Sequence, residues 1–273
     1  MFSNNLLMAA GASPPPIGFY ADIVTAGLTD GLQFSLDAGA IDSYPSGNQW
    51  LDQSGNAHHF YLGADGSVSG DEPTHNGTPG DLSSTEYWTF SGNDFFRLAQ
   101  SNPSWVDDMH QDNAQWSWIL WYYGIAVGTN FYYMGTGIGG VGERPSVNHF
   151  TNNLERQIVS AFYDTGIAFS PGTHASSLNI GAWNMLGESV DEAVGASGGF
   201  HYLNGVETPY TSTYSTPSSN PAAYTLEIAA AGNGVKPVET GCRIGGAMMW
   251  SGVALSAANF DTIWAAQKGR FGL

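Results

Sequence analysis

Short apolar runs separated by turn residues make up most of the chain, as in proteins built from many short strands. LQFSLDAG (32–39) alternates apolar and polar residues, which indicates a strand with one buried face. QWSWILWYYG (115–124) is apolar almost throughout and predicts a central strand buried on both faces. The pair Asn204-Gly205 within GGFHYLNGVE is a strong signal for a hairpin turn. The pattern therefore predicts an all-β fold.

Helical spacing is found only near the C-terminus, in SAANFDTIWAAQKGRF (256–271). Ser256 is a suitable N-cap, and Phe260, Ile263 and Trp264 recur at the spacing of one helix face. Gly269 is expected to end this short helix. We find no internal repeat and no second domain, so residues 31–273 are expected to form one β-sandwich.

Residues 1–30 are predicted to form an extended arm. The prolines at 14–16 make a stiff spacer, and the apolar residues before it are expected to dock on another chain or to fold back on their own domain. Those apolar residues are Phe2, Leu6, Leu7 and Met8. The segment lacks a positively charged start and has only a short apolar run, so we do not expect a signal peptide. No apolar stretch is long enough to predict a membrane span.

Acidic residues dominate the charge, with 24 Asp and Glu against 7 Lys and Arg and a formal net charge of -17. Such a surface repels phosphate backbones and anionic lipids, so neither nucleic acid nor membrane is an expected partner. The acidity either keeps a glycine-rich sheet protein soluble or includes ligands for calcium. The single cysteine, Cys242, cannot form an intrachain disulfide and is expected to be a buried apolar residue.

Five pieces in order resemble the laminin-G-like branch of the concanavalin A-like lectin/glucanase fold, over residues 32–273. They are LQFSLDAGAIDSYPSGNQWLDQSGNAHHF, YWTFSGNDFFRLA, QWSWILWYYG, SLNIGAWNMLGE with GFHYLNGVE, and CRIGGAMMWSGVALSAANFDTIW. The resemblance implies a jelly-roll β-sandwich with a short C-terminal helix.

The stretch WLDQSGNAHHF (50–60) is then expected to be a corner of the sandwich, with Trp50 packed inside. Some members of the family hold a structural calcium, and Asp52, Asn56 and Asp94 are the candidate ligands here. Alternatively, Asp52 and Asn56 bond to their own backbone in Asx-turns. The adjacent His58 and His59 would face opposite sides of a strand, which disfavours a shared metal. We expect no other cofactor.

The fold hosts glycoside hydrolases as well as lectins, so it does not decide the function. The glucanase branch carries its acids at Glu-x-Asp-x-(x)-Glu spacing, and this pattern is not found. Glu188, Asp191 and Glu192 have the wrong offsets, in a segment predicted to be a loop. Asp107, Asp108 and Asp112 also lie in a predicted loop. The chain is therefore not expected to be an enzyme.

Lectin-like sandwiches hold glycans by stacking exposed aromatic rings on apolar sugar faces. The candidates in or near loops are Trp88, Trp105, Tyr210 and Tyr214. The alternative for each is packing against its own domain. Trp116, Trp118 and Trp121 are strand residues and are expected in the core.

A start of MFSNNLLMAAGA without a signal peptide, followed by a laminin-G-like domain, resembles tailed-bacteriophage virion proteins. The resemblance implies a capsid decoration or tail-fibre component, made in the host cytoplasm and exposed on the virion surface. Its arm would bind a capsid or tail protein, and a homo-oligomer is expected on such a symmetric lattice. The alternatives are a divergent polysaccharide-active glycoside hydrolase and a free lectin-like adhesin.

Overall fold

The computed structural model describes residues 17–125, 131–137, 146–151, 158–163, 168–173, 178–210, 220–235 and 237–273. The candidate residues Phe2, Leu6, Leu7, Met8 and Tyr214 lie outside these ranges. Within the described ranges, no helix has the length and apolar character needed to cross a membrane.

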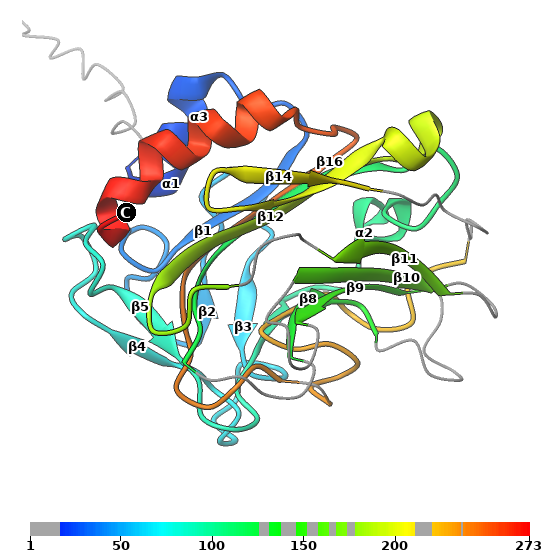
Figure 1. Cartoon of the computed structure of the whole chain (residues 1–273). Helices are drawn as coiled ribbons and strands as arrows, with labels where there is room; N and C mark the ends of the chain where they lie inside the picture. Colours follow the sequence, from blue (N-terminus) through cyan, green and yellow to red (C-terminus); the bar gives the residue numbers. More distant parts are fainter. Residues whose placement is uncertain are drawn as a thin grey trace, which may run out of the picture.

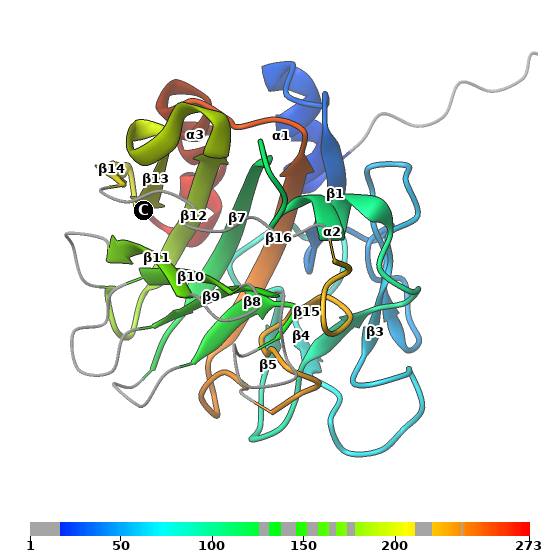
Figure 2. The same cartoon turned by 90° about the vertical axis from the view of Figure 1, so that its right-hand side faces the viewer.

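Two antiparallel sheets form the two layers of the sandwich (Figures 1 and 2). In sheet A the order is β14 (Val206–Pro209), β13 (Gly199–Leu203), β12 (Trp183–Asp191), β7 (Gln115–Tyr123), β16 (Arg243–Ser251), β5 (Tyr87–Thr89) and β4 (Thr74–Asn76), and β1 (Leu32–Asp37) also pairs with β16. In sheet B it is β11 (Ala168–Thr173), β10 (Ile158–Tyr163), β9 (Ser146–Thr151), β8 (Tyr132–Gly135), β15 (Glu227–Ile228), β6 (Phe96–Leu98), β3 (Phe60–Leu62) and β2 (Gln49–Trp50).

The central strand β7 is buried on both faces, as its apolar run predicts. Trp116 and Trp118 pack into the core between the sheets. Trp121 points to the opposite face and packs in a second core beneath helices α1 (Gly18–Ala26) and α3 (Ala257–Gln267). These two helices lie together on that side of sheet A (Figure 1).

Helix α1 corrects the prediction that residues 1–30 are an extended arm. Its Phe19 and Ile23 are buried against sheet A and α3. The Phe19 N–H donates to Asp37 Oδ2 at 3.0 Å, and Arg270 Nη1 pairs with Asp37 Oδ1 at 2.6 Å. Residues 18–26 therefore belong to the folded domain, and an arm is left as a prediction only for the residues before them.

The C-terminal helix begins as predicted but ends differently. Ser256 Oγ accepts from the Asn259 N–H, and the Asn259 side chain accepts from the Ser256 N–H, which forms a capping box. The chain then passes through a 3₁₀ turn, η2 (Lys268–Phe271), to Gly272, whose φ is 75°. Gly269 lies within that turn, so the prediction that it ends the helix is wrong.

The turn at Asn204-Gly205 joins β13 to β14 as predicted. Both residues have positive φ, 51° and 87°, which matches the right-handed twist of a two-residue hairpin. Cys242 is fully buried in the core between the sheets, as expected. A short 3₁₀ segment, η1 (Glu192–Ser197), connects β12 to β13.

Candidate binding pocket beside helix α2

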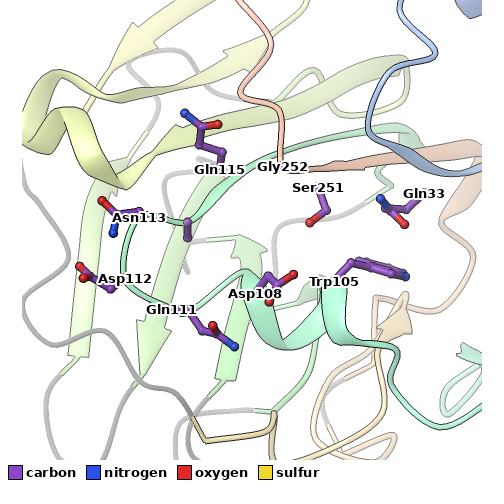
Figure 3. A pocket seen from close by; sticks show the side chains of 10 residues that line it. Gln33, Trp105, Asp108, Gln111, Asp112, Asn113, Gln115, Ser251 and Gly252 are labelled. Atoms are coloured by element: carbon purple, nitrogen blue, oxygen red, sulfur yellow. The ribbon is translucent and has the colours of Figure 1, made fainter.

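A pocket of about 390 Å³ lies between the short helix α2 (Ser104–Asp108), the loop after it, and the ends of β1, β7 and β16 (Figure 3). Its lining residues are Gln33, Trp105, Asp108, Gln111, Asp112, Asn113, Ala114, Gln115, Ser251 and Gly252. The wall is thus mostly polar, with one aromatic side chain. The volume falls within the range typical of small-molecule sites.

Helix α2 is held by its buried side. The Trp105 ring lies 6.1 Å from Phe34 and 5.4 Å from His58, and its Nε1–H points to His58 Nε2 at 3.4 Å. Asp107 Oδ1 accepts from the Ala222 N–H at 2.7 Å, which ties the helix to a distant segment. The wall formed by α2 is therefore anchored to the core on one side and to Ala222 on the other. The predicted loop is wrong for Asp107 and Asp108, which lie in α2, because five helical residues are too few to show a period. Asp112 lies in the loop after the helix, as predicted.

The side chains facing the pocket include groups that the protein does not use internally. Within the described part of the chain, the side chains of Asp108, Gln111 and Asp112 have no hydrogen-bonding partner. Figure 3 shows Asp108 on α2 directed toward Ser251 at the end of β16. Partial burial raises the pKa of the Asp108 carboxyl, and the charge of Asp107 raises it further, while His110 opposes this shift. This carboxylate is thus available to accept hydrogen bonds from a ligand.

Two glutamines at strand ends are oriented by the protein. Gln33 Nε2 donates to the Gly31 carbonyl at 3.1 Å, and Gln115 Nε2 donates to Asp191 Oδ2 at 2.8 Å. Since a carbonyl and a carboxylate only accept, both amides must present nitrogen to these partners. Each Oε1 is therefore left as an acceptor. Asn113, at φ 60°, turns the backbone here and donates its N–H to Glu192 at 2.6 Å.

Of the predicted glycan-contact residues that the structure describes, which are Trp88, Trp105 and Tyr210, only Trp105 lines this pocket. The residue is 6% exposed, so it offers a narrow apolar strip and not a full ring face. Trp88 is fully buried, with Trp50 at 5.7 Å and Phe96 at 5.2 Å between ring centroids, and Tyr210 is buried against His201 at 4.9 Å. The prediction that Trp88 and Tyr210 are exposed for glycan stacking is therefore wrong, and the alternative of packing in their own domain is correct.

The predicted calcium ligands are engaged within the protein. Asp52 Oδ1 accepts from the N–H groups of Ser35 at 2.9 Å and Ser54 at 2.8 Å, and its Oδ2 accepts from Ser54 Oγ at 2.7 Å. Asn56 Nδ2 donates to the Leu32 carbonyl at 2.7 Å. The bond from Ser54 N–H is an Asx-turn, so the structure supports that alternative for Asp52.

Asp94 belongs to a different turn, where its Oδ2 accepts from the Ser91 N–H at 2.6 Å. Burial raises the pKa of Asp94, and the charges of Glu72 and Asp71 add to that effect, opposed by the Ser91 hydrogen bonds. No group of three or more His, Cys, Asp or Glu side chains suited to a metal occurs among the described residues. The geometry therefore gives the calcium hypothesis no support.

Glu188 corrects another prediction, because it lies in strand β12 and not in a loop. It is paired with Trp118 on one side and His201 on the other. Its Oε2 accepts from Trp118 Nε1 at 2.9 Å, and its Oε1 lies 3.8 Å from His201 Nδ1. This glutamate is fully buried between the sheets and interrupts the apolar pattern of the strand.

The amides of the segment 111–115, which are Gln111, Asn113 and Gln115, are site residues that sequence reasoning missed. They stand directly before the most apolar strand of the chain. A run of amides and one acid next to the start of an apolar strand was the one sequence signal that could have indicated this site. The partners Gln33 and Ser251 are far away in sequence and show no local signal.

No protein-family model and no curated protein sequence matches the chain. Among solved structures, it is similar to domain 4 of AbnA, a GH43 extracellular arabinanase from Geobacillus stearothermophilus, in complex with arabinotriose. The identity is 16%, the match covers 85% of this chain and 97% of that one, and the TM-score is 0.57.

The botulinum neurotoxin serotype D binding domain is also similar, with 12% identity, 88% and 52% coverage of the two chains and a TM-score of 0.61. Trypanosoma rangeli sialidase in complex with the inhibitor DANA is similar too. The identity is 12%, the match covers 87% of this chain and 33% of the sialidase chain, and the TM-score is 0.55. The chain thus spans about half of the neurotoxin chain and a third of the sialidase chain. At these identities the similarities show the fold alone. Together with the sheet topology, they confirm the predicted fold class, a concanavalin A-like sandwich of two antiparallel sheets with a short C-terminal helix.

Proposed function

We propose that the chain is a non-catalytic glycan-binding domain and that the pocket beside α2 holds the sugar. The proposal rests on a pocket of about 390 Å³ lined by polar side chains, of which Asp108, Gln111 and Asp112 have no hydrogen-bonding partner within the described part of the chain. Amides, carboxylates and one aromatic edge are the groups that bind hydroxyls and the apolar parts of sugar rings.

Two similar structures support the same class of ligand. The arabinanase domain is in complex with arabinotriose, and the binding domain of botulinum neurotoxin DC, which is also similar to this chain, is in complex with SialylT. For the neurotoxin DC structure the identity is 10%, the match covers 88% of this chain and 52% of the neurotoxin chain, and the TM-score is 0.58. A shared fold does not transfer a ligand, so glycan binding by this chain rests on its own pocket.

The place of action proposed here is the surface of a phage virion, where the segment before α1 would anchor the domain to a capsid or tail protein. Its support is the resemblance of the first residues to virion proteins. The arabinanase, neurotoxin and sialidase structures add nothing to it. Electron cryo-microscopy of particles that carry the chain tests this placement, since the domain should point outward with residues 1–16 against a shell or tail subunit.

Glycan binding is tested by incubating the purified chain with a printed glycan array and measuring the strongest hit by calorimetry. We expect saturable binding that is lost on Asp108→Ala and kept on Asp42→Ala, since Asp42 is exposed and does not line the pocket. Absence of binding to every glycan would refute the proposal. Release of reducing ends from a polysaccharide would instead support the divergent hydrolase.

A further inference from the structure

The pocket presents mainly hydrogen-bond acceptors. Gln33 and Gln115 each donate one amide N–H, to the Gly31 carbonyl and to Asp191 Oδ2, which leaves each Oε1 and the second N–H of each amide for a ligand. The carboxylates of Asp108 and Asp112 accept only.

Donor hydrogens on the same wall are fewer than the lone pairs of its carboxylate and amide oxygens. They come from the side chains of Gln111, Asn113 and Ser251 and from the second amide N–H of Gln33 and Gln115. A ligand that satisfies this wall must therefore bring many donors of its own.

The charge of the wall restricts the ligand further. Two of the ten lining residues are acidic, and none of these ten is Lys, Arg or His. The chain as a whole carries a formal net charge of -17. A sugar carboxylate or phosphate placed here would face like charges with no cation to compensate them.

We infer that the pocket selects a neutral saccharide whose free hydroxyl groups donate to Asp108, Asp112 and the two glutamine oxygens. This inference rests on the proposed function and names its ligand class. Sialylated, uronic-acid and phosphorylated glycans are rejected by charge. O-methylated sugars are rejected because each ether has lost the proton that the wall accepts, which leaves carboxylate and amide oxygens unpaired in the complex.

The experiment compares three forms of one glycan. A glycan array that contains neutral, sialylated, uronate-bearing and amino glycans first identifies the strongest ligand. Calorimetry then measures this glycan, its per-O-methylated derivative and its uronate analogue. We expect the array signals to be confined to neutral glycans, no heat from the methylated form, and an uronate Kd weaker by at least about tenfold.

Several results would overturn the inference while the proposed function stands. They are equal binding of the uronate, retained binding of the methylated form, or array signals confined to acidic or amino glycans. If no glycan of any kind binds, the proposed function fails, and the inference fails with it. The two failures are thus distinguishable.

Variants that remove acidic charge test whether the pocket itself causes the discrimination against acidic glycans. In the double variant Asp108→Asn/Asp112→Asn the penalty on the uronate should shrink several-fold, since both like charges are gone from the wall. Asp42→Asn/Asp81→Asn removes the same charge at exposed positions outside the pocket lining and should leave the penalty unchanged. An equal effect from the control would assign the rejection to the net charge of the chain and contradict the role of the pocket.

Discussion

Replacing Asp108 by Ala should weaken glycan binding without destabilising the fold. Asp108 is mostly exposed, with its carboxyl only partly covered, and this side chain has no hydrogen-bonding partner within the described part of the chain. Helix α2 is held by other residues, the buried Trp105 and Val106. A surface change of this kind alters the free energy of unfolding by less than about 0.5 kcal/mol.

The loss of affinity follows from the charge on the acceptor. A hydrogen bond to a charged group contributes about 1.5–3 kcal/mol. One such bond between a sugar hydroxyl and Asp108 therefore corresponds to a rise in Kd of roughly 10- to 150-fold.

Calorimetric titration with the strongest array ligand measures this change, and a thermal melt of the same samples measures stability. The melting temperature should move by no more than about 2 °C. The control Asp42→Ala should leave both quantities unchanged. A change in Kd below about twofold would refute the role assigned to Asp108, and a large drop in melting temperature would show that the residue is structural.

Three further predictions address pH, the core and the N-terminal helix. Because the pKa of Asp108 is raised above its usual 3.8, glycan affinity should be constant at neutral pH and fall as the pH drops through that raised value; calorimetry with Asp108→Asn should give a flatter profile. Trp88→Ala removes a fully buried indole packed on Trp50 and should cost about 3–5 kcal/mol in urea unfolding; a cost below about 1 kcal/mol would contradict its place in the core. Arg270→Met leaves the fully buried Asp37 carboxylate without its ion pair and should cost about 3–5 kcal/mol by the same assay, whereas an unchanged denaturation midpoint would show that the pair does not hold α1 in place.

Strands and turns with a strong local signal could be predicted from the sequence. The apolar run of β7, the Asn204-Gly205 hairpin and the Ser256 cap all depend on residues within a few positions of one another. Helices α1 and α2 could not, because α1 follows a proline spacer and α2 is only five residues long.

Burial of individual side chains was harder to predict. Trp88 lies in a three-residue strand between polar loops, so its neighbours in sequence suggest exposure. It is covered by Trp50 and Phe96, which approach only through the tertiary fold. Glu188 is a polar residue in a buried strand, and its indole and imidazole neighbours come from two other strands.

The pocket was beyond sequence reasoning for the same reason. It joins Gln33, the segment 105–115 and the end of β16, which meet only when β1 and β7 both pair with β16. The segment 105–115 shows its polar character locally. The sequence does not show that this segment faces a cavity, because the cavity forms only when α2 packs beside the ends of β1 and β16.

A crystal structure of the chain with its strongest array ligand would show whether the pocket beside α2 holds the sugar. We expect a sugar ring between α2 and the end of β16, with hydroxyls donating to Asp108 and to the Oε1 atoms of Gln33 and Gln115. A sugar bound elsewhere on the sandwich, with the pocket beside α2 filled by solvent, would contradict this expectation.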